Sequence, residues 1–333
     1  MRTNYKKFMK RTGFTFTIFM LLSIVGRAQE ATTVFNFLKL PHSAHVTALG
    51  GENISTIEDD LTIAFQNPAL LSNVSDKTLS LSYTSYIEGS KVGSAAFSRQ
   101  FGNRSAWAIG AQYMDYGKII ETDIENNDLG EMSVKDMALM GIYNYNLSDK
   151  WSGGVTAKFI HGSYADYTSY AIGVDLGLNY YNAESDFSAS LTFLNLGGQI
   201  KGFDDNHEKL PSNMQVGFTK RLAHAPIRLS VTLNDLTHWE SSYFNPNNKD
   251  ISFGDYLLNH LIFGVEITPS DRFYIAAGYN CKRGNDLKIE GGSKWTGFSL
   301  GAGLQLKRIK LGAAYANYHT AASSLIMNVS IGL

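Results

Sequence analysis

The pentapeptide Gly297-Phe298-Ser299-Leu300-Gly301 has the G-x-S-x-G spacing in which hydrolases place a serine nucleophile. That chemistry requires a sharp turn from a strand into a helix, which exposes the serine hydroxyl to its catalytic partners. Here the motif lies inside a run of alternating apolar and small residues, and no helical pattern follows it. We therefore interpret Ser299 as a small side chain within a strand and predict that the chain has no catalytic residues.

Metal-binding patterns are also missing from the sequence. The eight histidines form no H-E-x-x-H or similar spacing. Two acidic runs, Asp123-Glu125-Asp128 and Asp204-Asp205-Glu208, offer the carboxylates that calcium prefers, but their spacing matches no calcium-binding loop. The single cysteine, Cys281, excludes an internal disulfide and a thiolate zinc cluster. The sequence thus predicts neither a metal nor a cofactor.

The first 28 residues have the layout of a secretory signal peptide. A basic region ending at Arg11 precedes an apolar run from Phe14 to Val25, and Gly26-Arg27-Ala28 offers a small-residue cleavage site. Removal of residues 1–28 leaves 23 basic and 30 acidic residues, a net charge of −7, which argues against nucleic acid as a partner. We expect an exported protein.

The elements that would carry any function are long amphipathic strands. Apolar and polar or small residues alternate through 168–181, 227–234, 298–306 and 325–333. A period of two indicates a strand with one apolar face. Soluble strands are usually about five or six residues long, whereas a tilted strand that crosses a bilayer needs about 9–11. The length therefore favours transmembrane strands.

Fourteen such strands can be placed, with connections of two kinds. The strands are predicted at 78–86, 91–101, 106–116, 133–145, 151–161, 168–181, 186–196, 213–222, 225–235, 257–267, 271–281, 295–306, 308–318 and 323–333. Every second connection is short, and those between are mostly long, as at 117–132, 197–212, 236–256 and 282–294. Outer-membrane barrels have short periplasmic turns and longer outer loops. Residues 78–333 are therefore predicted to form an all-β, transmembrane antiparallel barrel of about 14 strands.

Residues 29–77 do not alternate and instead suggest short capped helices. Ser43 can cap a turn that ends at Gly50-Gly51, and Asp59 or Asp60 can cap a second. Asn67 can cap a third with Pro68 at its first position. The inward faces of the strands carry mostly small residues, which leaves room in the lumen, so we predict a plug folded in the periplasmic mouth. A small cap outside the barrel is the alternative.

One long outer connection is rich in aromatic residues. The loop 237–256 contains Trp239, Tyr243 and Phe244, followed by Phe253 and Tyr256. Exposed aromatic clusters mark interaction sites. We predict that Trp239, Tyr243 and Phe244 bind a partner, with packing onto the barrel rim as the alternative.

Several segments resemble the PorQ family of the type IX secretion system, within the FadL-like outer-membrane barrels. They are FNFLKLPHSAHVTALGG at 35–51, LSLSYTSYIEGSKVGSAAFS at 79–98, MSVKDMALMGIYNY at 132–145 and HAPIRLSVTLNDLTHW at 224–239. The pattern SAHVTALGG, DD and FQNPALL is similar to the N-terminal plug signature of the FadL-like barrels. His45 stands where that motif is expected to have arginine, and the chain ends in Leu333 rather than an aromatic residue.

The resemblance implies a non-enzymatic barrel embedded in outer-membrane lipid, which anchors a PorZ-like surface protein alongside PorU-like and PorV-like proteins in a complex that attaches cargo to the cell surface. A FadL-like channel for a hydrophobic small molecule is the alternative, because both functions use the same fold and plug. Fold alone does not separate them.

Overall fold

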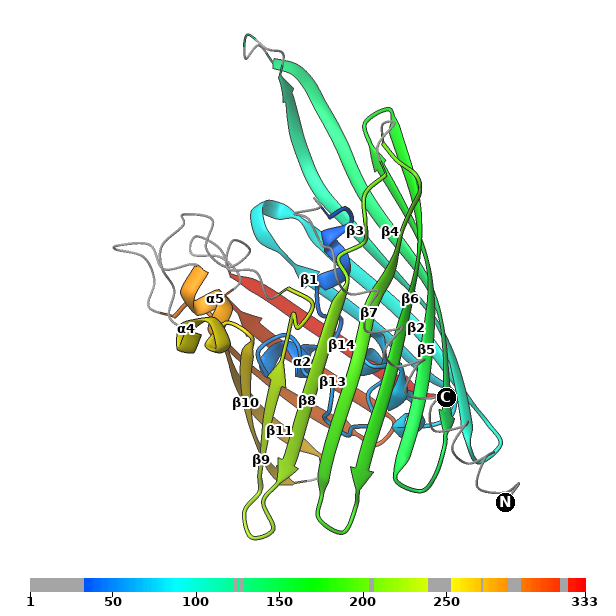
Figure 1. Cartoon of the computed structure of the whole chain (residues 1–333), viewed down its shortest axis with the longest axis vertical. Coiled ribbons are helices and arrows are strands. Elements are labelled where there is room, and N and C mark those ends of the chain that lie inside the picture. The colour runs from blue at the N-terminus through cyan, green and yellow to red at the C-terminus, as the bar shows by residue number, and fades with distance from the viewer. Residues whose placement is uncertain are drawn as a thin grey trace, which may run out of the picture.

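The computed structural model describes residues 33–122, 125, 128–203, 207–238, 253–270, 272–286, 295–317 and 323–333. Fourteen strands in these ranges form one closed antiparallel barrel, in which consecutive strands pair and β1 pairs with β14 (Figure 1). The strands are β1 (Thr78–Ser85), β2 (Lys91–Phe101), β3 (Ser105–Thr122), β4 (Asp128–Asn146), β5 (Trp151–Tyr164), β6 (Tyr167–Asn182), β7 (Phe187–Lys201), β8 (Asn213–Arg221), β9 (Ile227–Leu233), β10 (Leu261–Ser270), β11 (Phe273–Asn280), β12 (Phe298–Leu306), β13 (Ile309–Ala316) and β14 (Ser324–Gly332). The predicted fold class is confirmed.

The helices among the described residues are short. They are the 3-10 helices η1 (Asn36–Lys39), η2 (Leu61–Phe65), η3 (Pro68–Asn73) and η4 (Ile87–Gly89), and the α-helices α2 (Ala44–Ala48), α4 (Phe253–Leu258) and α5 (Cys281–Asp286). In the ranges given above, no helix is long and apolar enough to cross a lipid bilayer.

The two faces of the wall differ as the alternation predicts. Leu229, Phe263 and Leu300 point outward and are exposed, whereas their neighbours Ser230 and Thr232 point inward and are buried. An apolar exterior is what a barrel needs to sit in lipid, and closure removes the free strand edges that lipid could not satisfy.

The barrel is much taller on one side than on the other. Strands β3 to β7 have 14 to 19 residues, and the remaining strands have 7 to 11. Figure 1 shows the β3–β4 hairpin rising above the rest of the molecule, with α4 and α5 beside the lower wall.

Several sequence-based boundaries are wrong. The seventh strand, predicted to end at 196, continues to Lys201. The segment 117–132, predicted as a long loop, is mostly strand, since β3 continues to Thr122 and β4 begins at Asp128. Its many acidic and Asn residues are unfavourable in strands, but backbone pairing across the hairpin outweighs that preference. The tenth strand, predicted from 257, begins at Leu261 because α4 occupies the preceding residues.

The N-terminal segment lies inside the barrel. Helix α2 packs against β11 to β14, and η3 packs against β3 to β6 on the opposite wall (Figure 1). The segment also reaches further than the mouth that the sequence suggested, because the Val34 N–H donates to the Lys209 carbonyl in the β7–β8 connection. Residues 33–77 therefore extend along the lumen, and we refer to them as the plug.

Candidate functional site

The plug is a series of tight turns fixed by its own side chains. Ser43 Oγ accepts from the Val46 N–H, Asp60 Oδ1 from the Thr62 N–H, and Asn67 Oδ1 from the Ala69 N–H. Each side chain therefore satisfies a backbone donor that the start of a helix leaves open. These caps lie where the sequence placed them, with Pro68 at the first position of η3, although η2 and η3 are 3-10 rather than α-helical.

Gly50 and Gly51 end the first of these turns with φ angles of 101° and 94°, a backbone conformation that glycine adopts without strain. The Gly51 N–H donates to the Val46 carbonyl, and the Gly50 N–H donates to Ser299 Oγ at 3.0 Å. Ser299 Oγ also donates to the Ala48 carbonyl at 2.9 Å. Ser299 lies on the inward face of β12, and its hydroxyl fixes the end of α2 to the wall.

Wall glycines let the opposite side of the plug approach the backbone of the strands. A Cβ atom on Gly154 would collide with the Pro68 carbonyl group, and one on Gly177 would collide with Asn67 Oδ1. The Asn67-Pro68 step therefore sits in a recess of β5 and β6 made by two missing side chains. The small inward residues of the strands predicted room for the plug in the lumen. The contacts of Asn67-Pro68 with Gly154 and Gly177 show where the plug uses that room.

Neutral hydrogen bonds complete this recess. Asn144 Nδ2 and Ser152 Oγ both donate to the Ala69 carbonyl at 2.9 Å. Asn67 Nδ2 donates to the Ile54 carbonyl at 2.8 Å, which ties η3 to the chain that follows α2. All of these side chains are buried, so each bond replaces water that the site excludes.

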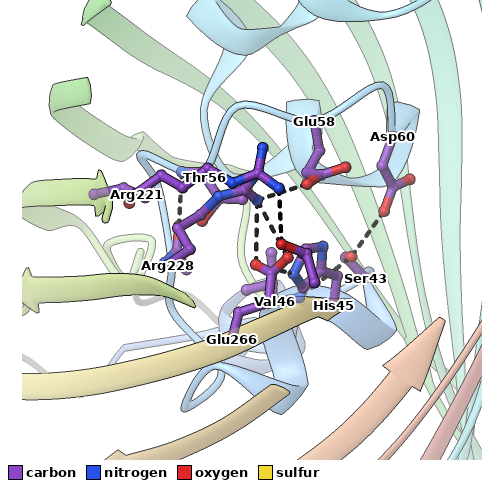
Figure 2. Close-up of polar contacts among 12 residues, drawn as sticks. Ser43, His45, Val46, Thr56, Glu58, Asp60, Arg221, Arg228 and Glu266 are labelled. Carbon is purple, nitrogen blue, oxygen red and sulfur yellow. Dashed lines mark hydrogen bonds and ion pairs between the residues drawn. The ribbon is translucent and has the colours of Figure 1, made fainter. Parts of the chain in front are cut away.

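A charged cluster joins the plug to β9 and β10 (Figure 2). Arg228 Nη1 lies 2.6 Å from Glu58 Oε1 on the plug and 3.1 Å from Glu266 Oε2 on β10. His45 Nε2 of α2 lies 3.0 Å from the same Glu266 oxygen. Arg228 and Glu266 are direct partners in the β9–β10 register, so the wall presents them as a cross-strand pair.

Burial makes these charges depend on one another. The side chains of Glu266, His45 and Arg228 are only 1%, 3% and 11% exposed. Burial alone lowers the pKa of His45, but the hydrogen bond to Glu266 and the charges of Glu266 and Glu58 outweigh it and raise the pKa above its ordinary value of 6.5. His42 contrasts with it, because burial and the charge of Lys158 lower its pKa to about 3.

His45, Glu58 and Glu266 have the composition of a metal-binding triad, with donor atoms within 4.8 Å of one another. The guanidinium of Arg228, however, contacts both carboxylates. A cation would have to displace Arg228 from these contacts. In the native chain we therefore interpret the four residues as a link between plug and wall, and we call them the charged latch.

A cavity of about 390 Å³ adjoins the charged latch. Its lining includes His45, Glu58, Glu266 and Arg228, together with Thr268 and Arg272 at the β10–β11 turn. This turn belongs to the short-turn end of the barrel. Apolar side chains, among them Phe273, Leu304 and Leu311, share the lining with these charged and polar groups. The Tyr274 ring stacks on His45 with ring centroids 4.0 Å apart.

The other half of the lumen is filled by apolar side chains of the plug. Phe35, Phe37 and Leu38 are buried in one cluster with Met140 and Ile160 of the wall. Gln112 Nε2 of β3 donates to the Phe37 carbonyl at 3.1 Å, so β3 also holds this end of the plug.

The predicted partner residues Trp239, Tyr243 and Phe244 lie outside the described residues. Charged residues surround the point where this loop begins. Asp235 Oδ1 lies 2.6 Å from His238 Nδ1, and Asp235 Oδ2 lies 3.2 Å from Lys282 Nζ. Asp123, Asp204 and Asp205 of the two acidic runs also lie outside the described ranges.

Sequence reasoning missed Arg228 and Glu266. The available signal was their position, since each is a charged residue on the inward face of a strand that has no other charged residue on that face. Nothing in the sequence paired them with Glu58, which follows α2 in an irregular segment.

No family model matches this chain, and no curated protein matches its sequence. Solved structures do share its fold. The toluene transporter TodX of Pseudomonas putida aligns with a TM-score of 0.52 and 14% identity over 90% of this chain and 98% of that chain. A FadL homologue of Pseudomonas aeruginosa gives 0.52 and 10% identity, covering 86% and 97%. The monoaromatic hydrocarbon channel CymD gives 0.55 and 10% identity, covering 89% and 98%. At these identities the likeness shows the barrel fold alone.

Proposed function

We propose that this chain is an integral outer-membrane barrel that holds a protein partner at the cell surface and performs no catalysis. The observation that carries the proposal is the fit of the plug, with Asn67-Pro68 seated against Gly154 and Gly177 and α2 linked to the wall by the charged latch. A lumen filled in this way suits an anchor, because an anchor needs an outer surface but no passage.

The finer part of the proposal is a role like that of the PorQ family in the type IX secretion system. It is supported by the resemblance of segments 35–51, 79–98, 132–145 and 224–239. The partners would be a PorZ-like surface protein, a PorU-like protein and a PorV-like barrel. Export would use residues 1–28 as a signal peptide, and the apolar outer face would lie in outer-membrane lipid.

The second candidate function is a FadL-like channel for a hydrophobic small molecule. The apolar cluster around Phe35, Phe37 and Leu38 favours it, since such a cluster is the kind of surface that a hydrophobic ligand would contact. A ligand would have to displace these side chains, because the plug itself occupies that volume.

Affinity purification of the tagged protein from gently solubilised outer membranes separates the two functions. An anchor should co-purify the PorZ-like, PorU-like and PorV-like proteins, and deletion of the gene should release cargo from the cell surface. Normal cargo attachment after deletion, together with slower uptake of a monoaromatic hydrocarbon, would establish the channel instead.

The partner surface is tested by the triple variant Trp239→Ala, Tyr243→Ala and Phe244→Ala. Because aromatic side chains dominate many interfaces, this variant should lose its surface partner while still inserting into the membrane. The matched control is Asp204→Ala, Asp205→Ala and Glu208→Ala in another outer connection. Co-purification of the partner at wild-type yield by the aromatic variant would assign these residues to rim packing.

A further inference from the structure

The outer part of the β3–β4 hairpin has no neighbouring strands among the described residues. Pairing of β2 with β3 ends at Lys91 and Asp115, and pairing of β4 with β5 ends at Val134 and Tyr164. The β3–β4 ladder nevertheless continues to the Thr122–Asp128 pair. Figure 1 shows the result, a two-stranded ribbon that stands clear of the barrel.

A ribbon of this kind is poorly stabilised by itself. Two strands alone are marginal in water, because they lack a face on which to bury apolar side chains. Ile119 and Ile120 are 38% and 61% exposed. As consecutive strand residues they point to opposite faces, so packing on one side cannot cover both.

The outer edge of β3 has room for one more paired strand. From Lys118 to Thr122, β3 pairs with β4 on one side and with no described strand on the other. Native proteins often block such an edge with proline or with a bulge that turns it away. Residues 116–134 contain no proline. The β3–β4 ladder shifts its register between Asp115 and Lys118 and again between Glu121 and Thr122, so the regular part of this edge runs from Lys118 to Glu121. An exposed edge of this type binds an extended peptide through backbone hydrogen bonds.

Charge indicates what kind of peptide would bind. Residues 118–132 include five acidic residues and one basic residue, Lys118. A basic strand would be attracted to this segment, whereas the hairpin of a second copy would be repelled by its like charge. This argument disfavours self-association through the same edge.

We propose that the β3 edge from Lys118 to Thr122 is the docking site for an extended segment, rich in lysine or arginine, of a surface protein partner. The segment adds to the hairpin as a third strand and covers one face with its own apolar side chains. This inference rests on the proposed anchoring function and adds a second element, besides the aromatic loop 237–256, that would hold the partner.

The test uses the full-length protein in detergent and a fluorescent peptide of about ten residues in which lysine and valine alternate, long enough for one strand. The peptide should bind the wild-type protein. Methylation of its four central backbone nitrogens should weaken binding roughly tenfold or more, because strand addition needs those donors. A peptide with glutamate in place of lysine should bind at least about tenfold more weakly.

The matched variant replaces residues 120–131 by Asn-Gly, which closes the hairpin directly after the Ile119–Met132 pair. It should keep the heat-dependent gel migration of a folded barrel and lose peptide binding. The control, Asp204→Asn with Asp205→Asn and Glu208→Gln, removes three acidic residues from other outer positions and should bind normally.

Equal binding by the shortened variant, or by the methylated peptide, would overturn the proposal, since charge alone would then explain binding. Self-association of the wild type that excludes the peptide would overturn it in favour of a second copy. Cargo attachment in cells shows whether the docking site or the anchoring function itself is wrong. If gene deletion releases cargo but the shortened variant retains it, the docking site is wrong and anchoring stands; if deletion leaves cargo attached, anchoring itself fails.

Discussion

On the β5–β6 side of the lumen the plug is held by shape and neutral hydrogen bonds, whereas on the β9–β10 side it is held by charges. The first contact relies on Gly154 and Gly177, whose missing side chains admit Asn67-Pro68. The second relies on Arg228 between Glu58 and Glu266. Steric fit is insensitive to pH and salt, while buried charges depend on their partners and protonation. The two attachments should therefore respond to different perturbations.

The largest effect should come from removing the positive charge of the latch. Arg228→Met leaves Glu58 and Glu266 close together without their cation, and loss of one partner from a buried ion pair typically costs roughly 3–5 kcal/mol. Denaturant unfolding in detergent should show this loss. The control is Arg99→Met, because the Arg99–Asp76 pair is 44% exposed on both sides, where solvent screens the charges and the pair should contribute little to stability.

The same variant sharpens the metal question. In Arg228→Met, added Zn²⁺ should recover part of the lost stability, because the donor atoms of His45, Glu58 and Glu266 lie within 4.8 Å of one another. The wild type should gain nothing from the ion. Equal stabilisation of both proteins would show that Zn²⁺ binds elsewhere.

Overfilling the neutral recess should have a smaller effect. Gly154→Val places atoms where the Pro68 carbonyl lies, and overpacking typically costs about 1–3 kcal/mol. The plug should shift, which we expect to raise ion conductance in planar bilayers. Gly141→Val is the matched control on the neighbouring strand, since a Cβ there meets nothing within 4 Å. Similar conductance of the two variants would contradict the conclusion that the plug is seated against Gly154.

Loss of a single polar group should cost less. Asn67→Ala removes the cap of η3 and the hydrogen bond to Ile54, which together should lower stability by about 1–2 kcal/mol. Asn73→Ala removes one partly buried bond at the other end of η3 and should be nearly neutral. The difference in unfolding midpoint between the two variants measures the cap together with the bond to Ile54.

The smallest effect should be the pH dependence of the latch. Because the pKa of His45 is raised in the folded chain, its contribution is complete below the ordinary value of 6.5 and is lost as pH rises through the raised value. Plug attachment should weaken over that interval, and His45→Gln should abolish the dependence. His42 should not contribute, because its pKa of about 3 keeps it neutral there. Stronger plug attachment at higher pH would contradict the conclusion that protonated His45 stabilises the latch.

Much of the wall could be predicted because membrane strands follow a simple pattern. Alternation placed strands such as β5, β8 and β14 within a few residues, and the short connections identified one end of the barrel. The β3–β4 hairpin was underestimated because its acidic outer half lacks alternation and is held by pairing across the hairpin. Capping residues were readable in the plug because a cap acts within three residues of sequence.

The sequence by itself determined the antiparallel barrel, the capped turns of the plug and the small residues that leave space in the lumen, because each depends on neighbours along the chain or on a period of two. Only the tertiary structure decided that Asn67-Pro68 meets Gly154 and Gly177, and that His45, Glu58, Arg228 and Glu266 converge. These contacts join residues far apart in sequence, and closure of the barrel around the plug brings them together.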